Sequence, residues 1–253
     1  MAHLPGKFVW FEHVSNDIAK ARSFYEPLFG WHTEAMPMGG GDPYHVILNA
    51  GAGIGGYSKA PAAAPNTWLS YLSVADVDAS YKTVLGAGAK SLMAPMAYGS
   101  AGRAATVADP TGAVFSLWKG SQDDPADTDN AATGAFLWNE LTTQDEKSAL
   151  AFYEKSFGFT HEAMPMPQGT YNILKQGEHR RGGLCKAMDA SAPAMWMQYV
   201  KVDDCDAASA KAKSLGAHIV VPPSDIPNVG RFSMFTDPLG AMIAVLKPAM
   251  PAA

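Results

Sequence analysis

The order of hydrophobic and polar residues along the chain predicts a series of strands and helices. Residues Phe8 to Val14 are large or β-branched, which predicts a strand. A helix is expected through Ala19 to Leu28, with Asn16 or Asp17 as its cap and Gly30 as its end. Short strands are expected next, separated by Gly and Pro, around Met36, at Tyr44–Leu48 and at Ile54–Tyr57.

The same order of elements then follows again. A strand is expected at Trp68–Val74, and a helix that ends near Gly86 to Gly88 follows Asp76 and Asp78. Further strands are expected near Leu92, at Arg103–Val107 and at Val114–Trp118. The pattern predicts a doubled βαβββ module and an α+β fold class.

The second half of the chain repeats the first at a nearly constant offset. Trp10 and Glu12 recur as Trp138 and Glu140, and the run EAMPM occurs in both halves. A register kept over so many rare residues indicates gene duplication. The acidic, Pro-containing stretch SQDDPADTDN between the copies is typical of a linker. We therefore divide the chain into a first copy (1–122), a linker (123–132) and a second copy (133–253).

Composition narrows the possible partners. The formal net charge is −5 with scattered Lys and Arg, so we expect no binding to nucleic acid. No stretch approaches the roughly 18 apolar residues of a membrane span, and no export signal is indicated. The two cysteines, Cys185 and Cys205, form no metal-type pair and fit a reducing compartment. A cytoplasmic protein is expected, either a monomer or a homodimer.

Two motifs, each present in both copies, carry a family resemblance. They are Asp17-x6-Phe24-Tyr25-x3-Phe29-Gly30-Trp31 with its partner Phe152-Tyr153-x3-Phe157-Gly158-Phe159, and the Asp-Pro-x-Gly turns at Asp109 and Asp237. The chain resembles the vicinal oxygen chelate superfamily, which includes glyoxalases, bleomycin resistance proteins and extradiol dioxygenases. The Trp-x-Glu opening resembles a tandem, glyoxalase-related branch. The resemblance implies cup-shaped curled sheets, and in the metal enzymes a divalent ion held by His, Gln or Glu.

The family positions for metal ligands carry other residue types in this sequence. They hold Trp10 and Trp138 on the first strands, and Ser116 and Ala244 on the last strands. None of these side chains is a credible ligand for such an ion. We predict no cofactor and no metal at the usual positions, while a divalent ion held by shifted ligands stays an alternative, with Glu12, His45 and Glu140 as its candidates.

Glu12 and Glu140 are the candidate catalytic residues. Side chains alternate along a strand, so each Glu shares a face with the neighbouring Trp, and the family register points that face into the cup. A carboxylate there is either a shifted metal ligand or a general base, or it is a structural anion paired with backbone amides or an Arg. His45 is a candidate acid, base or ligand contact on a strand of the first cup, or else a partly buried structural histidine.

Aromatic and basic residues complete the expected ligand site. Trp10, Trp138, Tyr71 and Tyr199 are either core residues or walls against which a flat ligand stacks. Arg103 and Arg231 either meet an anionic group of the ligand or serve as surface charges or partners for the glutamates.

The expected function is small-molecule binding in the two cups of a glyoxalase-like protein, with catalysis left open. One alternative is a divalent-metal lyase, isomerase or dioxygenase with shifted ligands. The other is a non-catalytic protein that sequesters its ligand, as bleomycin resistance proteins do. The missing donors favour the second alternative over the first.

Overall fold

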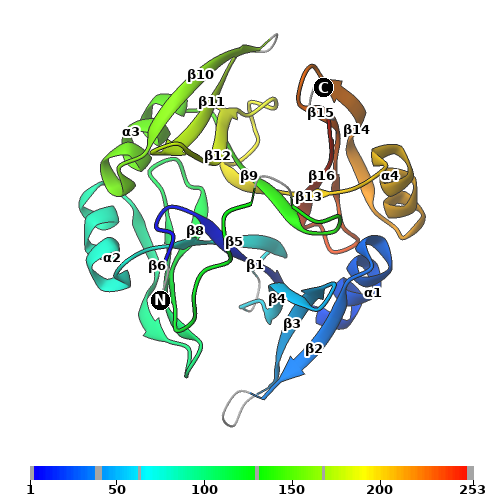
Figure 1. The fold of residues 1–253 in the computed structure, drawn as a ribbon, viewed down its shortest axis with the longest axis horizontal. Coiled ribbons are helices and arrows are strands. Elements are labelled where there is room, and N and C mark those ends of the chain that lie inside the picture. The colour runs from blue at the N-terminus through cyan, green and yellow to red at the C-terminus, as the bar shows by residue number, and fades with distance from the viewer. Residues whose placement is uncertain (1–2, 38–41, 62–63, 129–130, 167–168, 250–253) are drawn as a thin grey trace. The chain divides into compact units, whose positions relative to one another are not determined.

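A computed structural model describes residues 3–37, 42–61, 64–128, 131–166 and 169–249 (Figure 1). The first copy contains β1 (Phe8–Ser15), α1 (Ile18–Phe29), β2 (His32–Met36), β3 (Tyr44–Asn49), β4 (Ala52–Lys59), β5 (Thr67–Ser73), α2 (Val77–Gly86), β6 (Lys90–Ala97), β7 (Gly102–Ala108) and β8 (Val114–Gly120). The second copy contains β9 (Phe136–Thr143), α3 (Glu146–Phe157), β10 (Thr160–Met166), β11 (Gly169–Gln176), β12 (His179–Lys186), β13 (Met195–Lys201), α4 (Cys205–Ser214), β14 (His218–Ile226), β15 (Gly230–Thr236) and β16 (Met242–Pro248).

Each copy forms one curled, mixed sheet of eight strands. The strand order is β2-β3-β4-β1-β5-β8-β7-β6 in the first copy and β10-β11-β12-β9-β13-β16-β15-β14 in the second. The two orders are the same once the copies are aligned, and β1 pairs with β4 in parallel, as β9 does with β12. The predicted α+β class and the doubled βαβββ module are therefore confirmed.

Local residue chemistry accounts for the helix ends. Asp17 caps α1 by accepting a hydrogen bond from the Lys20 amide, and Asp145 caps α3 in the same way. Gly30 and Gly158 end these helices with φ angles of 72° and 67°, a left-handed conformation that favours glycine.

The chain packs into two compact units that do not coincide with the two copies. Unit 1 consists of Met1–Trp10, Leu69–Asp127 and Trp138–Trp196, and unit 2 of Phe11–Trp68, Thr128–Leu137 and Met197–Ala253. Each unit therefore combines one βαβββ module of the first copy with one of the second. The repeat boundaries drawn from the sequence and the compact units divide the chain differently.

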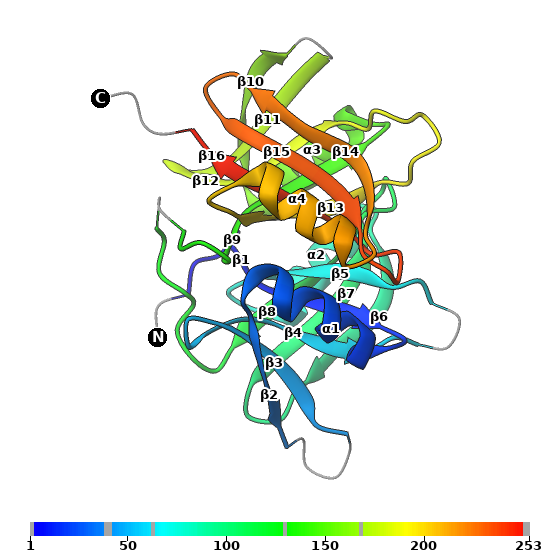
Figure 2. The same cartoon turned by 90° about the vertical axis from the view of Figure 1, so that its right-hand side faces the viewer.

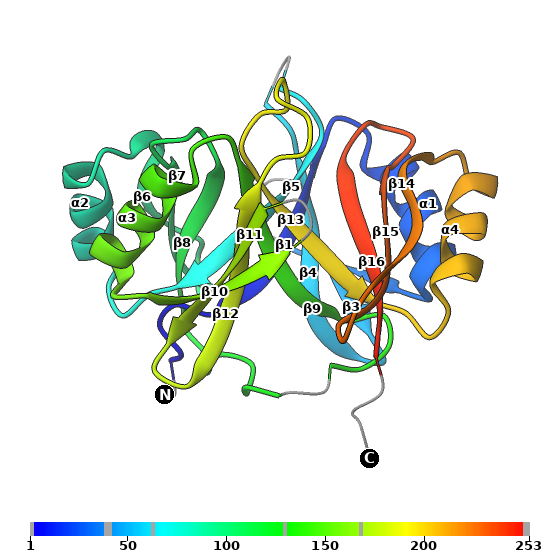
Figure 3. The same cartoon turned by 90° about the horizontal axis from the view of Figure 1, so that it is seen from above.

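Within each unit the helices come from both copies. In unit 2, α1 and α4 lie side by side (Figure 2). In unit 1, α2 and α3 do the same (Figure 3). Among the described residues, no helix is long and apolar enough to cross a membrane.

Candidate functional site

Strand β1 turns Glu12 and His13 to opposite faces of its sheet. The His13 ring lies 5.3 Å from the ring of Tyr25 in α1, so His13 faces the helix. Because neighbouring residues of a strand alternate, Glu12 lies on the face turned away from that helix. Glu140 has the same position in β9, next to the fully buried Leu141. Both carboxylates are buried, with 6% of Glu12 and 7% of Glu140 exposed.

In the second copy, Glu140 belongs to a hydrogen-bonded cluster that lies wholly within unit 1. We call Trp138, Glu140, Tyr171, Gly183 and Cys185 the Glu140 cluster. The Trp138 indole N–H donates to the Tyr171 hydroxyl over 2.7 Å. The Tyr171 hydroxyl and the Cys185 thiol both lie close enough to Glu140 for its carboxylate to raise their pKa values. Gly183 lies opposite Glu140 in the parallel pairing of β12 with β9.

Burial controls the proton state of this cluster. Burial raises the pKa of Tyr171 well above its usual value, and the nearby Glu140 carboxylate raises it further. Burial and the same carboxylate also raise the pKa of the Cys185 thiol well above its usual range. The phenol and the thiol therefore stay protonated near neutral pH and act as donors toward Glu140.

The first copy carries the corresponding arrangement in unit 2. Glu12 lies opposite Gly56 in the pairing of β1 with β4. A methyl group on Gly56 would overlap the Tyr44 hydroxyl, so the Tyr44 ring covers that glycine. Ser58 stands where the second copy has Cys185. The carboxylate, tyrosine and glycine are thus shared by the copies, whereas the thiol belongs to the second copy only.

The positions at which the metal enzymes hold their ion do not offer a matching donor set. Ser116 hydrogen-bonds the Thr106 hydroxyl at 2.8 Å, and Ala244 pairs with Tyr199 on β13. Trp138 uses its indole N–H to hold Tyr171. In the described part of the chain, no group of three or more His, Cys, Asp or Glu side chains could hold a metal ion. These residues do not fit the ion that the resemblance implies. That the protein binds no metal at the usual positions stays a prediction.

His45 does not share a face with Glu12. It pairs with Tyr57, which in turn pairs with His13 on β1. Directly paired residues lie on the same face of a sheet, so His45 belongs to the helix-covered face. Glu12 and His45 therefore lie on opposite faces of this sheet, and a role of either residue in holding a metal stays a prediction.

The remaining predicted residues lie in several places. Tyr71 and Tyr199 are buried, and Tyr71 pairs with Ser116 on β8. Arg103 forms a bidentate ion pair with Asp78, with distances of 2.7 and 2.8 Å. Arg231 forms the same kind of pair with Asp206. Both arginines are thus engaged by acidic residues in the first turn of a helix, and their contact with a ligand stays a prediction.

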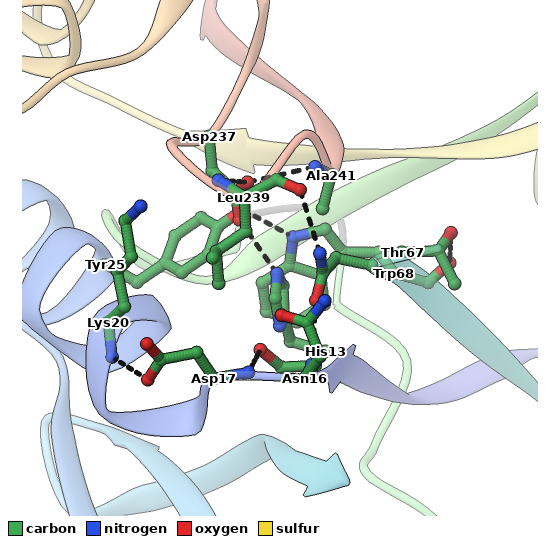
Figure 4. Close-up of polar contacts among 12 residues, drawn as sticks. His13, Asn16, Asp17, Lys20, Tyr25, Thr67, Trp68, Asp237, Leu239 and Ala241 are labelled. Carbon is green, nitrogen blue, oxygen red and sulfur yellow. Dashed lines mark hydrogen bonds and ion pairs between the residues drawn. The ribbon is translucent and has the colours of Figure 1, made fainter. Parts of the chain in front are cut away.

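A second buried cluster in unit 2 is one that the sequence patterns did not reveal (Figure 4). Asp237 accepts hydrogen bonds from His13 Nε2 at 2.8 Å and from the Tyr25 hydroxyl at 3.0 Å. Tyr25 in turn accepts from the Trp68 indole at 2.9 Å. Burial alone would raise the pKa of Asp237, but His13 and the amides of the following turn lower it overall. The His13 and Asp237 side chains are fully enclosed, so this cluster is structural.

Unit 1 has a matching chain of buried side chains. Trp196 donates to the Tyr153 hydroxyl at 2.8 Å, and Tyr153 donates to Asp109 at 2.9 Å. The Tyr of the Phe-Tyr motif in one copy is therefore bonded to the Asp of the Asp-Pro-x-Gly turn in the other. The sequence shows both motifs but not this pairing between them.

Comparison with known proteins identifies the family. The family model described as the Glyoxalase/Bleomycin resistance protein/Dioxygenase superfamily matches residues 7–117 and 135–245. The chain belongs to this superfamily. The match occurs once in each copy, which agrees with the duplicated modules of the sheet.

Relatives of similar length share much of the sequence. The chain is 38% identical over 246 residues to "Putative glyoxylase CFP32" of Mycobacterium tuberculosis (strain CDC 1551 / Oshkosh), covering 95% of this chain and 94% of the relative. It is 28% identical over 259 residues to "Anthracycline biosynthesis protein DnrV" of Streptomyces peucetius, covering 96% of this chain and 94% of the relative.

Two solved structures share the fold of this chain. A Mn(II)-bound glyoxalase from Novosphingobium aromaticivorans has a TM-score of 0.65 at 18% identity, covering 95% of this chain and 81% of that one. A trihydroxybiphenyl dioxygenase from Sphingomonas wittichii has a TM-score of 0.65 at 14% identity, covering 97% and 91%. At these identities the likeness shows the fold alone.

Proposed function

We propose that this protein binds a flat, amphipathic organic molecule on the sheet faces that carry Glu12 and Glu140. The observation that carries the proposal is the buried Glu140 carboxylate, which shares with Trp138 the face of β9 turned away from the helices. A buried carboxylate is costly unless it is paired, and such groups concentrate at functional sites. In this role Glu140 accepts a hydrogen bond or a proton from the polar group of the ligand.

The character of the surrounding residues supports an aromatic ligand. Indole and phenol rings provide large, flat contact areas, and Trp138 and Tyr171 lie beside the carboxylate. A relative at 28% identity over almost the whole chain is named for anthracycline biosynthesis. A hydroxyanthraquinone, which is flat and carries a phenolic donor, is therefore a suitable probe.

The test compares Glu140→Gln with the wild type in a titration of hydroxyanthraquinone followed by tryptophan fluorescence. To read one site, both proteins carry Glu12→Gln, and the exposed Glu162→Gln serves as a control. We expect Glu140→Gln to weaken binding at least about tenfold, because a hydrogen bond to a charged group contributes about 1.5–3 kcal/mol. The melting temperature should change little. Unchanged affinity with a lowered melting temperature would instead assign Glu140 a structural role.

The other two functions predict different outcomes for the same protein. Purification without an affinity tag, followed by metal analysis, tests the divalent-metal lyase, isomerase or dioxygenase. A stoichiometric ion whose removal abolishes turnover would establish that alternative. Mass spectrometry of the probe after incubation tests sequestration, because a sequestering protein returns its ligand unchanged. Conversion of the probe that Glu140→Gln abolishes would show that Glu140 takes part in catalysis.

A further inference from the structure

A glycine in each copy makes room for a tyrosine beside the buried glutamate. A Cβ atom added to Gly183 would overlap the Tyr171 hydroxyl and would lie 3.0 Å from Trp138 Nε1. The same addition at Gly56 would overlap the hydroxyl of Tyr44. The two glycines also occupy the same register position, directly opposite Glu140 and Glu12. Close approach of a neighbouring side chain is thus the physical reason for glycine in these strands.

The hydrogen-bond chain in the second copy has a fixed direction. An indole N–H can only donate, so the Tyr171 oxygen is the acceptor of the 2.7 Å bond from Trp138. The proton of the Tyr171 hydroxyl is then available to the nearby Glu140 carboxylate, which raises the pKa of the phenol. Because the phenol remains protonated, this direction does not reverse near neutral pH. Trp138 therefore aligns Tyr171, and Tyr171 aligns the carboxylate.

We propose that Tyr171 is a positioning residue that keeps the Glu140 carboxylate oriented toward a bound ligand. The site then takes ligands with neutral hydroxyl or N–H donors rather than anions. This inference rests on the proposed function of Glu140. A carboxylate flanked by protonated donors meets a ligand as an acceptor, and a second negative charge beside it would be repelled. Tyr44 has the corresponding role toward Glu12.

The geometry can be tested without any ligand through the reactivity of Cys185. The Glu140 carboxylate helps to raise the pKa of this thiol, so displacement of Glu140 should increase the thiolate fraction and the rate of alkylation. In a Cys205→Ser background, iodoacetamide should modify Cys185 faster in Tyr171→Phe and Gly183→Ala than in the parent. The rate should rise about threefold for each unit of pKa lost, because the thiolate fraction rises about tenfold while the nucleophilicity of the thiolate falls. Glu140→Gln gives the upper limit, and Tyr44→Phe, in the other copy, should leave the rate unchanged.

The functional part uses the pH dependence of binding in the Glu12→Gln background. Removal of the Tyr171 hydroxyl takes a donor from the charged carboxylate, so protonation of Glu140 becomes easier. The acid limb of hydroxyanthraquinone binding should then move to higher pH in both Tyr171→Phe and Gly183→Ala. The methyl ether of the probe, which lacks the donor, should bind at least about tenfold more weakly.

The two readouts separate failure of this inference from failure of the proposed function. If Glu140→Gln accelerates the alkylation of Cys185 but Tyr171→Phe does not, Tyr171 does not hold the carboxylate. This conclusion does not depend on whether a ligand binds. An unchanged acid limb in Tyr171→Phe, with binding lost in Glu140→Gln, would overturn the positioning role alone. Equal binding of the probe and its methyl ether would overturn the stated ligand class. If no variant binds the probe but alkylation is accelerated as expected, the contact between Tyr171 and Glu140 is correct. The proposed function and the ligand-positioning role of Tyr171 are then both overturned.

Discussion

Both compact units contain a buried Trp–Tyr–Asp chain, but only unit 2 adds a histidine to it. Asp237 accepts hydrogen bonds from His13 and Tyr25, whereas the position of His13 in the second copy holds Leu141. Leu141 is fully buried, so the same site accommodates an apolar side chain. The Tyr–Asp bond is therefore common to the two units, and the histidine is an additional, ionisable group in unit 2 alone.

The additional histidine also changes how well the polar atoms of the cluster are satisfied. His13 Nε2 is bonded to Asp237, but the buried Nδ1 atom has no hydrogen-bond partner among the described residues. A buried polar atom without a partner lowers stability. The stabilisation from the His13–Asp237 bond is therefore partly offset within the same side chain.

The largest effect is expected from removal of Asp237. Asp237→Ala leaves His13 and Tyr25 without their shared acceptor and removes the carboxylate that bonds the Leu239 and Ala241 amides. Loss of one partner of a buried pair costs about 3–5 kcal/mol. Urea unfolding should show this loss, and a smaller one for Asp109→Ala, which leaves no histidine behind. Equal losses would mean that His13 contributes nothing specific.

A smaller effect is expected when unit 2 is made like unit 1. His13→Leu introduces the residue that the second copy already carries and removes one donor from Asp237 while Tyr25 remains. We expect a loss of about 1.5–3 kcal/mol, the range for a hydrogen bond to a charged group. A thermal denaturation series would check it, with Leu141→Ala as a cavity-forming reference. A more stable variant would show that the unpaired Nδ1 atom outweighs the bond.

Removal of the tyrosine hydroxyl should cost more stability in unit 1 than in unit 2. Among the residues that the structure describes, Tyr153 is the only side chain that donates to Asp109 Oδ2, and Tyr153→Phe removes this bond. Tyr25→Phe, in contrast, leaves His13 on the same oxygen of Asp237. Tyr153→Phe should therefore destabilise the protein more than Tyr25→Phe, by about 1 kcal/mol. Parallel urea titrations of the two variants measure this difference. The reverse order would indicate that His13 cannot substitute for the lost phenol.

The smallest effect concerns pH. The pKa of Asp237 is lowered in the folded protein, so its contribution to stability is present above the unfolded value of about 3.8 and is lost as pH falls through the folded value. His13→Leu should weaken this acid-side loss. The pKa values of Tyr25 and Tyr153 are raised, so their contributions are present below about 10 and are lost at higher pH. Melting temperatures across pH should thus separate wild type from His13→Leu on the acid side only.

Much of the fold could be predicted from local patterns. The caps Asp17 and Gly30 act through hydrogen bonds and backbone angles within a few residues, so the sequence contains all that is needed to recognise the helix. The alternation in β1 placed Trp10 and Glu12 on one face for the same reason. The candidate site was less accessible. The proposed role of Tyr171 depends on β11, which β12 separates from the strand of Glu140, although the glycines opposite each glutamate were a visible signal.

By itself the sequence determined the repeat, the βαβββ order and the superfamily, because periodicity, caps and motif spacing are encoded in short segments. Only the tertiary structure decided that His45 shares the helix-covered face with Tyr57, since a shift of one residue in register exchanges the two faces of a strand. It also decided that Tyr25 meets Asp237 across 212 positions of the chain. Such contacts arise when whole modules pack, and no local pattern specifies which copy supplies the partner.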